Sequence, residues 1–95
     1  MDTIWRFVLR IDDEQTLQMP MGAQILSVAK KDGELSLWAR VQTNRTKEDR
    51  TILMRGTGHP YPTDPCRFLG TIVDTREIEG AGISKTFVWH LFEKE

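Results

Sequence analysis

The sequence predicts a small all-β domain, a sandwich or partly open barrel of about five to seven short, mostly antiparallel strands. The clearest observation is the stretch QILSVAKKDGELSLWARVQ, residues 24–42. Asp32-Gly33 lies between two apolar runs there, and a two-residue hairpin turn needs the positive φ angles that such a pair tolerates. Further short alternating stretches are separated by turn residues, and no stretch has a helical period beyond one turn. The 95 residues make one domain, residues 1–95.

The central hairpin has a predicted register. Folding at Asp32-Gly33 pairs Lys31 with Glu34, Val28 with Leu37 and Leu26 with Ala39. Because side chains alternate along a strand, one face is apolar: Leu26, Val28, Leu35, Leu37, Ala39 and Val41. The opposite face carries Ser27, Ala29, Ser36 and Arg40 together with Ile25 and Trp38.

Elements before and after this hairpin follow from alternation and from turn residues. On the N-terminal side we expect a strand over Thr3–Ile11, a short strand over Thr16–Met19 and a tight turn at Met19–Gly22. After the hairpin we expect a polar loop over Thr43–Arg50, with one helical turn possible over Thr46–Thr51, and a short strand over Thr51–Arg55.

The C-terminal half begins with a shaped loop over Gly56–Pro65, which holds two glycines and three prolines. We then expect a strand over Phe68–Val73, in which Gly70 marks a bulge or a close backbone approach, and a turn over Asp74–Gly82. Asp64–Leu69 is the other short segment that would allow one helical turn. A closing strand over Thr86–Phe92 is apolar on both faces and is therefore expected inside a sheet.

Composition argues against several classes of partner and compartment. Thirteen basic and 14 acidic residues give a net charge of −1, which provides no electrostatic basis for binding nucleic acid or an anionic membrane. No apolar stretch approaches the roughly 20 residues that a membrane-spanning helix needs, and the N-terminus lacks the pattern of a secretory signal. With a lone Cys66 there is no internal disulfide. We expect a cytoplasmic protein.

No pattern of catalytic or cofactor-binding residues is present, so we expect no enzyme, no metal and no cofactor. His59 and His90 lack metal-ligand spacing, and Cys66 has no neighbouring base in the sequence. The most unusual segment is Gly56-Thr57-Gly58-His59-Pro60. Its glycines free backbone N–H groups for an anion-binding nest, with the ligand-binding candidates Arg55, Gly56, Gly58, His59 and Tyr61. The alternative is that this segment only turns the chain between two strands.

The second candidate surface surrounds Trp38. An exposed tryptophan beside an arginine is typical of a protein-interface hot spot, and the predicted register places Ile25, Trp38 and Arg40 together on the face opposite the core. The alternative is that loops of the chain cover this face and make a second core layer.

Three segments together carry a resemblance to a known family. They are Thr3-Ile4-Trp5, the stretch GAQILSV at residues 22–28 with LSLWA at 35–39, and the later GTGHP at 56–60 with FLGTI at 68–72. With these segments the chain resembles a family of short hypothetical proteins of bacteriophages and prophages, treated as a domain of unknown function. The resemblance implies a phage or prophage accessory protein in a bacterial host, without a catalytic assignment, that acts by binding.

We therefore expect a non-enzymatic module that binds a protein partner or itself through the Trp38 surface. The alternative is a binder of a small anionic, nucleotide-like ligand at the Gly56–Pro60 loop. An interface module predicts that Trp38→Ala or Arg40→Glu changes self-association or partner capture while the fold survives. A ligand binder predicts that Gly58→Val or His59→Ala abolishes a thermal shift produced by nucleotides.

Overall fold

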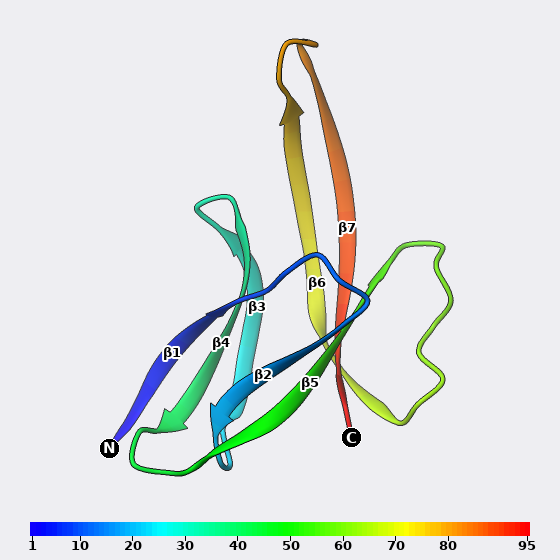
Figure 1. The fold of residues 1–95 in the computed structure, drawn as a ribbon. Coiled ribbons are helices and arrows are strands. Elements are labelled where there is room, and N and C mark those ends of the chain that lie inside the picture. The colour runs from blue at the N-terminus through cyan, green and yellow to red at the C-terminus, as the bar shows by residue number, and fades with distance from the viewer.

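The computed structural model describes residues 1–95 as seven antiparallel strands in two sheets, arranged as an open sandwich without helices (Figure 1). The strands are β1 (Asp2–Val8), β2 (Glu14–Pro20), β3 (Gln24–Lys31), β4 (Glu34–Gln42), β5 (Lys47–Gly56), β6 (Cys66–Ile78) and β7 (Ile83–Lys94). The predicted all-β fold is confirmed, and neither single helical turn forms. No helix is present that is long and apolar enough to cross a membrane.

The two sheets have the strand orders β1-β4-β3 and β2-β5-β7-β6. The core lies between them: β4 contributes every second residue from Leu35 to Val41, and the other sheet contributes mainly Ile52, Met54, Ile72 and Leu91. β7 lies between β5 and β6, as its two apolar faces predict. Burial of these aliphatic side chains is the main stabilising contribution to the fold.

The central hairpin folds at the predicted turn. Asp32 and Gly33 have φ angles of 49° and 79°, and the pairs Lys31–Glu34 and Val28–Leu37 are confirmed. The pairing of Leu26 with Ala39 is wrong, because the register shifts between Ile25 and Ser27 and places Ile25 opposite Ala39. A β-bulge adds one residue to a strand and so reverses the faces on its far side. Leu26 is consequently 46% exposed.

A second bulge lies in β6, at the glycine for which the sequence predicted a bulge or a close backbone approach. The register of β6 with β7 shifts between Phe68 and Gly70, and Gly70 has a φ of 151°. A Cβ at Gly70 would lie only 2.8 Å from Cγ2 of Val28. Both predictions for this glycine, a bulge and a close approach, are confirmed, and the close approach is between the two sheets.

Two predicted loops are wrong. β5 begins at Lys47, so only Thr43–Thr46 connects it to β4, and the polar residues 47–50 form strand because β2 pairs with them. Residues 74–78 belong to β6 and pair with residues 83–87 of β7, so the turn there is limited to residues 79–82.

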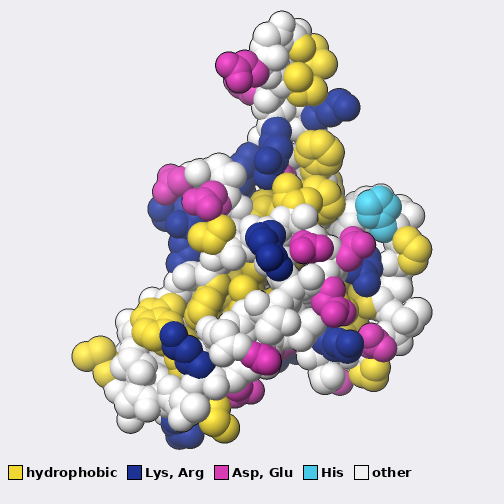
Figure 2. Space-filling view, viewed as in Figure 1, with side chains coloured by type: hydrophobic (Ala, Val, Ile, Leu, Met, Phe, Trp, Pro, Cys, Tyr) yellow, Lys and Arg dark blue, Asp and Glu magenta, His cyan; other side chains and the backbone are white.

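This long β6–β7 hairpin projects beyond the sandwich (Figure 1), and Figure 2 shows apolar and charged side chains intermingled along it. Both faces of its outer part meet solvent, since residues 75–87 are all exposed. A strand that is exposed on both faces needs no alternation of apolar and polar residues. For this reason the sequence of residues 74–82 predicted a turn and not the end of a strand.

Candidate functional site

The five residues predicted for ligand binding line one pocket, with a volume of about 380 Å³. We call it the glycine-loop pocket, and it is bordered by Arg55, Gly56, Thr57, Gly58, His59, Tyr61, Phe68, His90 and Phe92. Its size lies within the roughly 300–1,000 Å³ of small-molecule sites. The loop between β5 and β6 forms one wall, and the face of the four-stranded sheet that points away from the core forms the floor.

Strand register builds this floor in two adjacent rows. Arg55 of β5, His90 of β7 and Thr71 of β6 are direct cross-strand partners. The neighbouring row consists of Leu53, Phe92 and Phe68. Side chains two residues apart on a strand share a face and are separated by about 7 Å along it. A polar row thus lies beside an apolar row on one surface.

His90 is held between two hydroxyl groups. Its Nε2 lies 2.8 Å from Oγ1 of Thr57, and its Nδ1 lies 3.0 Å from Oγ1 of Thr71. Because a hydroxyl group both donates and accepts, each threonine can serve either ring tautomer. The first contact also joins the loop to β7 and fixes the start of the pocket wall.

The loop begins with a tight turn over Gly56–His59, in which the N–H of His59 donates to the carbonyl of Gly56 at 3.0 Å. Gly58 has a φ of 91° at the third position of this turn, where glycine is favoured. The N–H of Gly56 donates to Nδ1 of His59 at 3.3 Å. Nδ1 is therefore an acceptor, and the proton of a neutral His59 ring lies on Nε2, which is free to donate to a ligand.

Arg55 lies on the floor without an ionic partner. Its Nη1 donates to the carbonyl oxygens of Asp13 and Met54 at 2.8 and 2.9 Å, and its Nε and Nη2 groups make no hydrogen bond within the chain. Arg45 and Arg55 are the two arginines without a carboxylate at ion-pair distance. Of these, Arg45 is exposed and Arg55 is half-buried.

Aromatic rings form the other end of the pocket. Tyr61 and Phe68 each pack edge-on against Phe92, with ring centroids 5.0 and 5.5 Å apart. Phe92 is buried, whereas Tyr61 is 70% and Phe68 55% exposed. The two outer rings are thus fixed by contact with the sheet and still present surface to solvent.

The glycine-loop pocket has no carboxylate in its lining. The four other main pockets are each lined by at least one Asp or Glu. Asp12 and Asp13 line an adjoining hollow, which shares Gly56 and His59 with this pocket. In a chain of net charge −1, this combination of one arginine and two histidines favours an anionic ligand.

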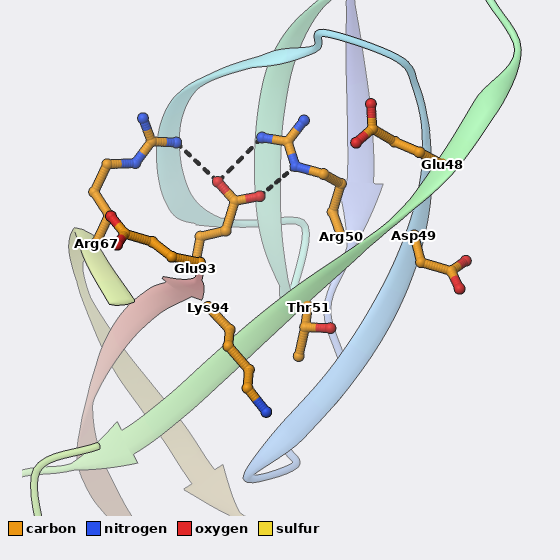
Figure 3. A pocket seen from close by; sticks show the side chains of 8 residues that line it. Glu48, Asp49, Arg50, Thr51, Arg67, Glu93 and Lys94 are labelled. Atoms are coloured by element: carbon orange, nitrogen blue, oxygen red, sulfur yellow. Dashed lines mark hydrogen bonds and ion pairs between the residues drawn. The ribbon is translucent and has the colours of Figure 1, made fainter. Parts of the chain in front are cut away.

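The most voluminous pocket, about 580 Å³, is lined only by polar and charged residues. Figure 3 shows Arg50 and Arg67 both directed at Glu93 within it, while Lys94 points elsewhere. Arg50 forms a bidentate ion pair with Glu93, and Arg67 Nη2 lies 2.8 Å from Glu93 Oε1. Lys94 is 3.2 Å from Asp64. Arg50, Arg67 and Lys94 are thus all paired with carboxylates of the chain. We therefore interpret this pocket as the surface of a stabilising ion-pair network and not as a ligand site.

Glu93 and Arg50 perturb each other's titration. Burial tends to raise the pKa of Glu93, but the hydrogen bonds and charges of Arg50 and Arg67 outweigh it and lower the pKa below its ordinary value. The hydrogen bond with Glu93 raises the pKa of Arg50. Arg50 also donates from Nη1 to the carbonyl of Ala23 at 2.9 Å, so the network ties the four-stranded sheet to the segment that enters β3.

The predicted interface residues are only partly brought together. Trp38 and Arg40 lie on the outer face of the three-stranded sheet, as expected from their position in β4. Ile25 does not join them, because the bulge at Leu26 directs it toward the core, where it packs against the buried cluster. Arg40 is paired with Asp2, with Nη2 and Oδ2 2.5 Å apart.

Sequence reasoning missed part of the glycine-loop pocket, namely Thr57, Phe68, His90 and Phe92. The sequence does show that His90 and Phe92 lie on one face of the closing strand, because they are two residues apart. Nothing in the sequence indicated that this strand would lie beside Arg55, since that pairing depends on the strand order. No three His, Cys, Asp or Glu side chains come together in a way that could hold a metal ion.

Comparisons with curated proteins and with solved structures found no match. A comparison with family models found one that matches residues 1–95, the whole chain, and it is described as a domain of unknown function, DUF7352. This protein therefore belongs to the family defined by the domain of unknown function DUF7352.

Proposed function

We propose that the protein is a non-enzymatic binding module and that the glycine-loop pocket binds a small anionic ligand. The observation that carries this proposal is the half-buried Arg55, which has no carboxylate partner and faces a pocket without acidic residues. A guanidinium in this position retains donors for a phosphate or carboxylate group.

Other groups of the pocket supplement Arg55. His59 offers its Nε2–H, and the hydroxyl group of Thr57, which contacts Nε2 of His90, supplies a further polar group in the lining. These groups are held by hydrogen bonds to strands and turns before any ligand arrives. Preorganised donors reduce the entropic cost of binding, so the arrangement supports recognition of an anion.

Native mass spectrometry of the protein as purified is the first test, since it reports subunit number and retained small molecules together. The melting temperature is then measured with inorganic pyrophosphate. We expect pyrophosphate to raise the melting temperature of the native chain, because a ligand that binds only the folded state stabilises it. Arg55→Gln and His59→Ala should remove this shift, while Arg45→Gln should retain it.

The proposal fails if neither pyrophosphate nor other phosphate-containing compounds raise the melting temperature of the native chain. It also fails if Arg45→Gln removes the shift as fully as Arg55→Gln does. In that case, the effect would reflect overall charge and not the pocket.

A second candidate function is protein binding or self-association through the outer face of the three-stranded sheet. The observation that favours it is a group of uncovered apolar side chains there: Ile4 is 59%, Val8 46% and Leu26 46% exposed, and Trp38 is half-buried among them. Leu26 thereby takes the place predicted for Ile25. Several uncovered apolar side chains on one sheet face, next to arginines, are typical of an interaction surface.

For this candidate we expect Trp38→Ala and Arg40→Glu to reduce self-association or capture of a partner. Size-exclusion chromatography with light scattering gives the subunit number of the native chain and of each variant, and circular dichroism verifies the fold. Unchanged assembly and unchanged capture in both variants would contradict an interface at Trp38.

We also propose that the protein is a phage or prophage accessory protein that functions in the cytoplasm of a bacterial host. The resemblance of the TIW, GAQILSV, LSLWA and GTGHP segments supports this origin. The test is the position of the encoding genes. A phage origin predicts that they lie among virion or lysogeny genes, and a scattered chromosomal distribution would contradict it.

A further inference from the structure

We infer that the ligand of the glycine-loop pocket carries a planar ring as well as an anionic group, and that nucleoside phosphates are the class it takes. This inference rests on the proposed function, because it assigns the anionic group to the same polar row. The new observation is the apolar row beside it, with the exposed rings of Tyr61 and Phe68.

The two rings are arranged for stacking. Both contact the buried Phe92 in edge-to-face arrangements, with interplanar angles of 74° and 62°, and both remain more than half exposed, so ring surface is left for a ligand. Aromatic side chains with exposed faces bind bases by stacking in a manner that tolerates different bases. Tyr61 and Phe68 come from the loop and from β6, so the rings border the pocket from two sides.

The spacing of the two rows fits one molecule. Arg55, His90 and Thr71 lie one row away from Phe92 and Phe68, a separation of about 7 Å along the strands. One sugar can span that distance between a phosphate and a base. The phosphate would lie near Arg55 and His59, and the base near Tyr61 and Phe68.

A small molecule fits better than a nucleic acid strand. The chain has a net charge of −1, whereas proteins that track a nucleic acid backbone need a basic groove. The pocket itself is flanked by Asp12 and Asp13 in the adjoining hollow, which would repel further phosphates on that side.

Calorimetric titration of the full chain tests the inference with the common ribonucleoside 5′-monophosphates, titrated separately. The comparison ligands are ribose 5-phosphate, which lacks the base, and the matching nucleosides, which lack the phosphate. We expect at least one nucleotide to bind at least about five-fold more tightly than ribose 5-phosphate, because stacking on aromatic side chains contributes at this scale.

Variants separate the two halves of the site. Tyr61→Ala and Phe68→Ala should reduce nucleotide affinity to that of ribose 5-phosphate and leave ribose 5-phosphate binding unchanged. Arg55→Gln should weaken both phosphate-containing ligands. Val73→Ala is the matched control, because Val73 is 61% exposed on β6 and lies outside the pocket lining. Circular dichroism establishes that each variant is folded.

The outcomes distinguish this inference from the proposed function. Equal affinities for nucleotides and ribose 5-phosphate, unaffected by Tyr61→Ala, would overturn the inference and leave the anion site in place. Absence of binding by every phosphate-containing ligand would overturn both. Tighter binding of a single-stranded oligonucleotide than of any mononucleotide would overturn the assignment to a small molecule.

Discussion

The ammonium group of Lys30 on β3 lies 2.7 Å from Oδ1 of Asp74 on β6, and this ion pair joins the two sheets at the base of the projecting hairpin. The Asp74 side chain is fully buried, and Arg76 Nε lies 2.8 Å from its other oxygen. The N–H of the Trp89 ring donates to the same oxygen at 3.4 Å. An ammonium group of β3 and two N–H donors, one from β6 and one from β7, therefore converge on one carboxylate.

Replacing this carboxylate should be costly. Asp74→Asn should lower the free energy of unfolding by about 3 kcal/mol, at the low end for broken buried ion pairs because Lys30 and Arg76 still reach water. Urea unfolding followed by circular dichroism measures the change. The control is Asp32→Asn, which removes an exposed pair with Lys31 and should have little measurable effect. Equal losses in the two variants would contradict a special role for Asp74.

Acid should destabilise the protein through two carboxylates. Burial tends to raise the pKa of Asp74, but Lys30, Arg76 and Trp89 outweigh it, so the pKa lies below the ordinary 3.8. The pKa of Glu93 likewise lies below 4.5. A carboxylate with a lowered pKa stabilises the fold at any pH above its ordinary value, and this contribution is lost as the pH falls through the folded-state pKa.

The stabilising contribution of Asp74 and Glu93 should therefore be complete above about pH 4.5 and decrease as the pH falls below it. Urea titrations at a series of pH values measure this dependence. The double variant Asp74→Asn/Glu93→Gln should be less stable at neutral pH and depend less on pH in this acid range. An unchanged acid slope in the double variant would show that other groups are responsible.

The fold could be predicted largely because its turns are local. Gly22, Asp32 and Gly33 adopt the positive φ angles that these residue types favour at turns. The central hairpin and most of its register could therefore be derived from neighbours in the sequence. The bulge at Leu26 could not, since nothing in the alternation of Ile25, Leu26 and Ser27 distinguishes a bulge from a regular strand. Because of this one extra residue, Leu26 is exposed at the outer face and Ile25 packs against the core.

The candidate site was predictable only in part for a related reason. Arg55, Gly56, Gly58, His59 and Tyr61 are close in sequence, and their composition alone suggested a loop that binds an anion. Their partners come from β6 and β7, and the meeting of Arg55 with His90 depends on a strand order that no local pattern encodes.

Gly70 should resist substitution for two separable reasons. Its φ of 151° is unfavourable for other residues, and a Cβ there would lie 2.8 Å from Val28 Cγ2. Gly80 has a φ of 78° but open space around it, so Gly80→Ala measures backbone strain alone, about 1–2 kcal/mol. Gly70→Ala should cost roughly 1–3 kcal/mol more, because the new methyl group overpacks against Val28 and because a φ of 151° is less accessible to other residues than 78°.

A double-mutant cycle tests the contact with Val28 directly. Because Val28→Ala removes the clashing methyl groups, the double variant Val28→Ala/Gly70→Ala should be more stable than the sum of the single effects predicts. Urea unfolding gives all three values. Strict additivity would mean that the two sheets separate enough to accept the new methyl group.

The two arginines on Glu93 should differ strongly in their contributions to stability. The Arg50 side chain is 14% exposed and also binds the carbonyl of Ala23, whereas the Arg67 side chain is 57% exposed. Arg50→Gln leaves Glu93 buried with one partner at the solvent edge, and it should lower the free energy of unfolding by about 3–5 kcal/mol. Arg67→Gln should change it by less than about 1 kcal/mol.

These two substitutions are chemically identical and remove partners of the same carboxylate, so each serves as the control for the other. Thermal and urea unfolding of both variants provides the comparison. A loss of similar size in both would mean that Glu93 is stabilised by total positive charge. The expected difference instead assigns the effect to the buried bidentate pair and to its hydrogen bond with Ala23, which links the four-stranded sheet to the start of β3.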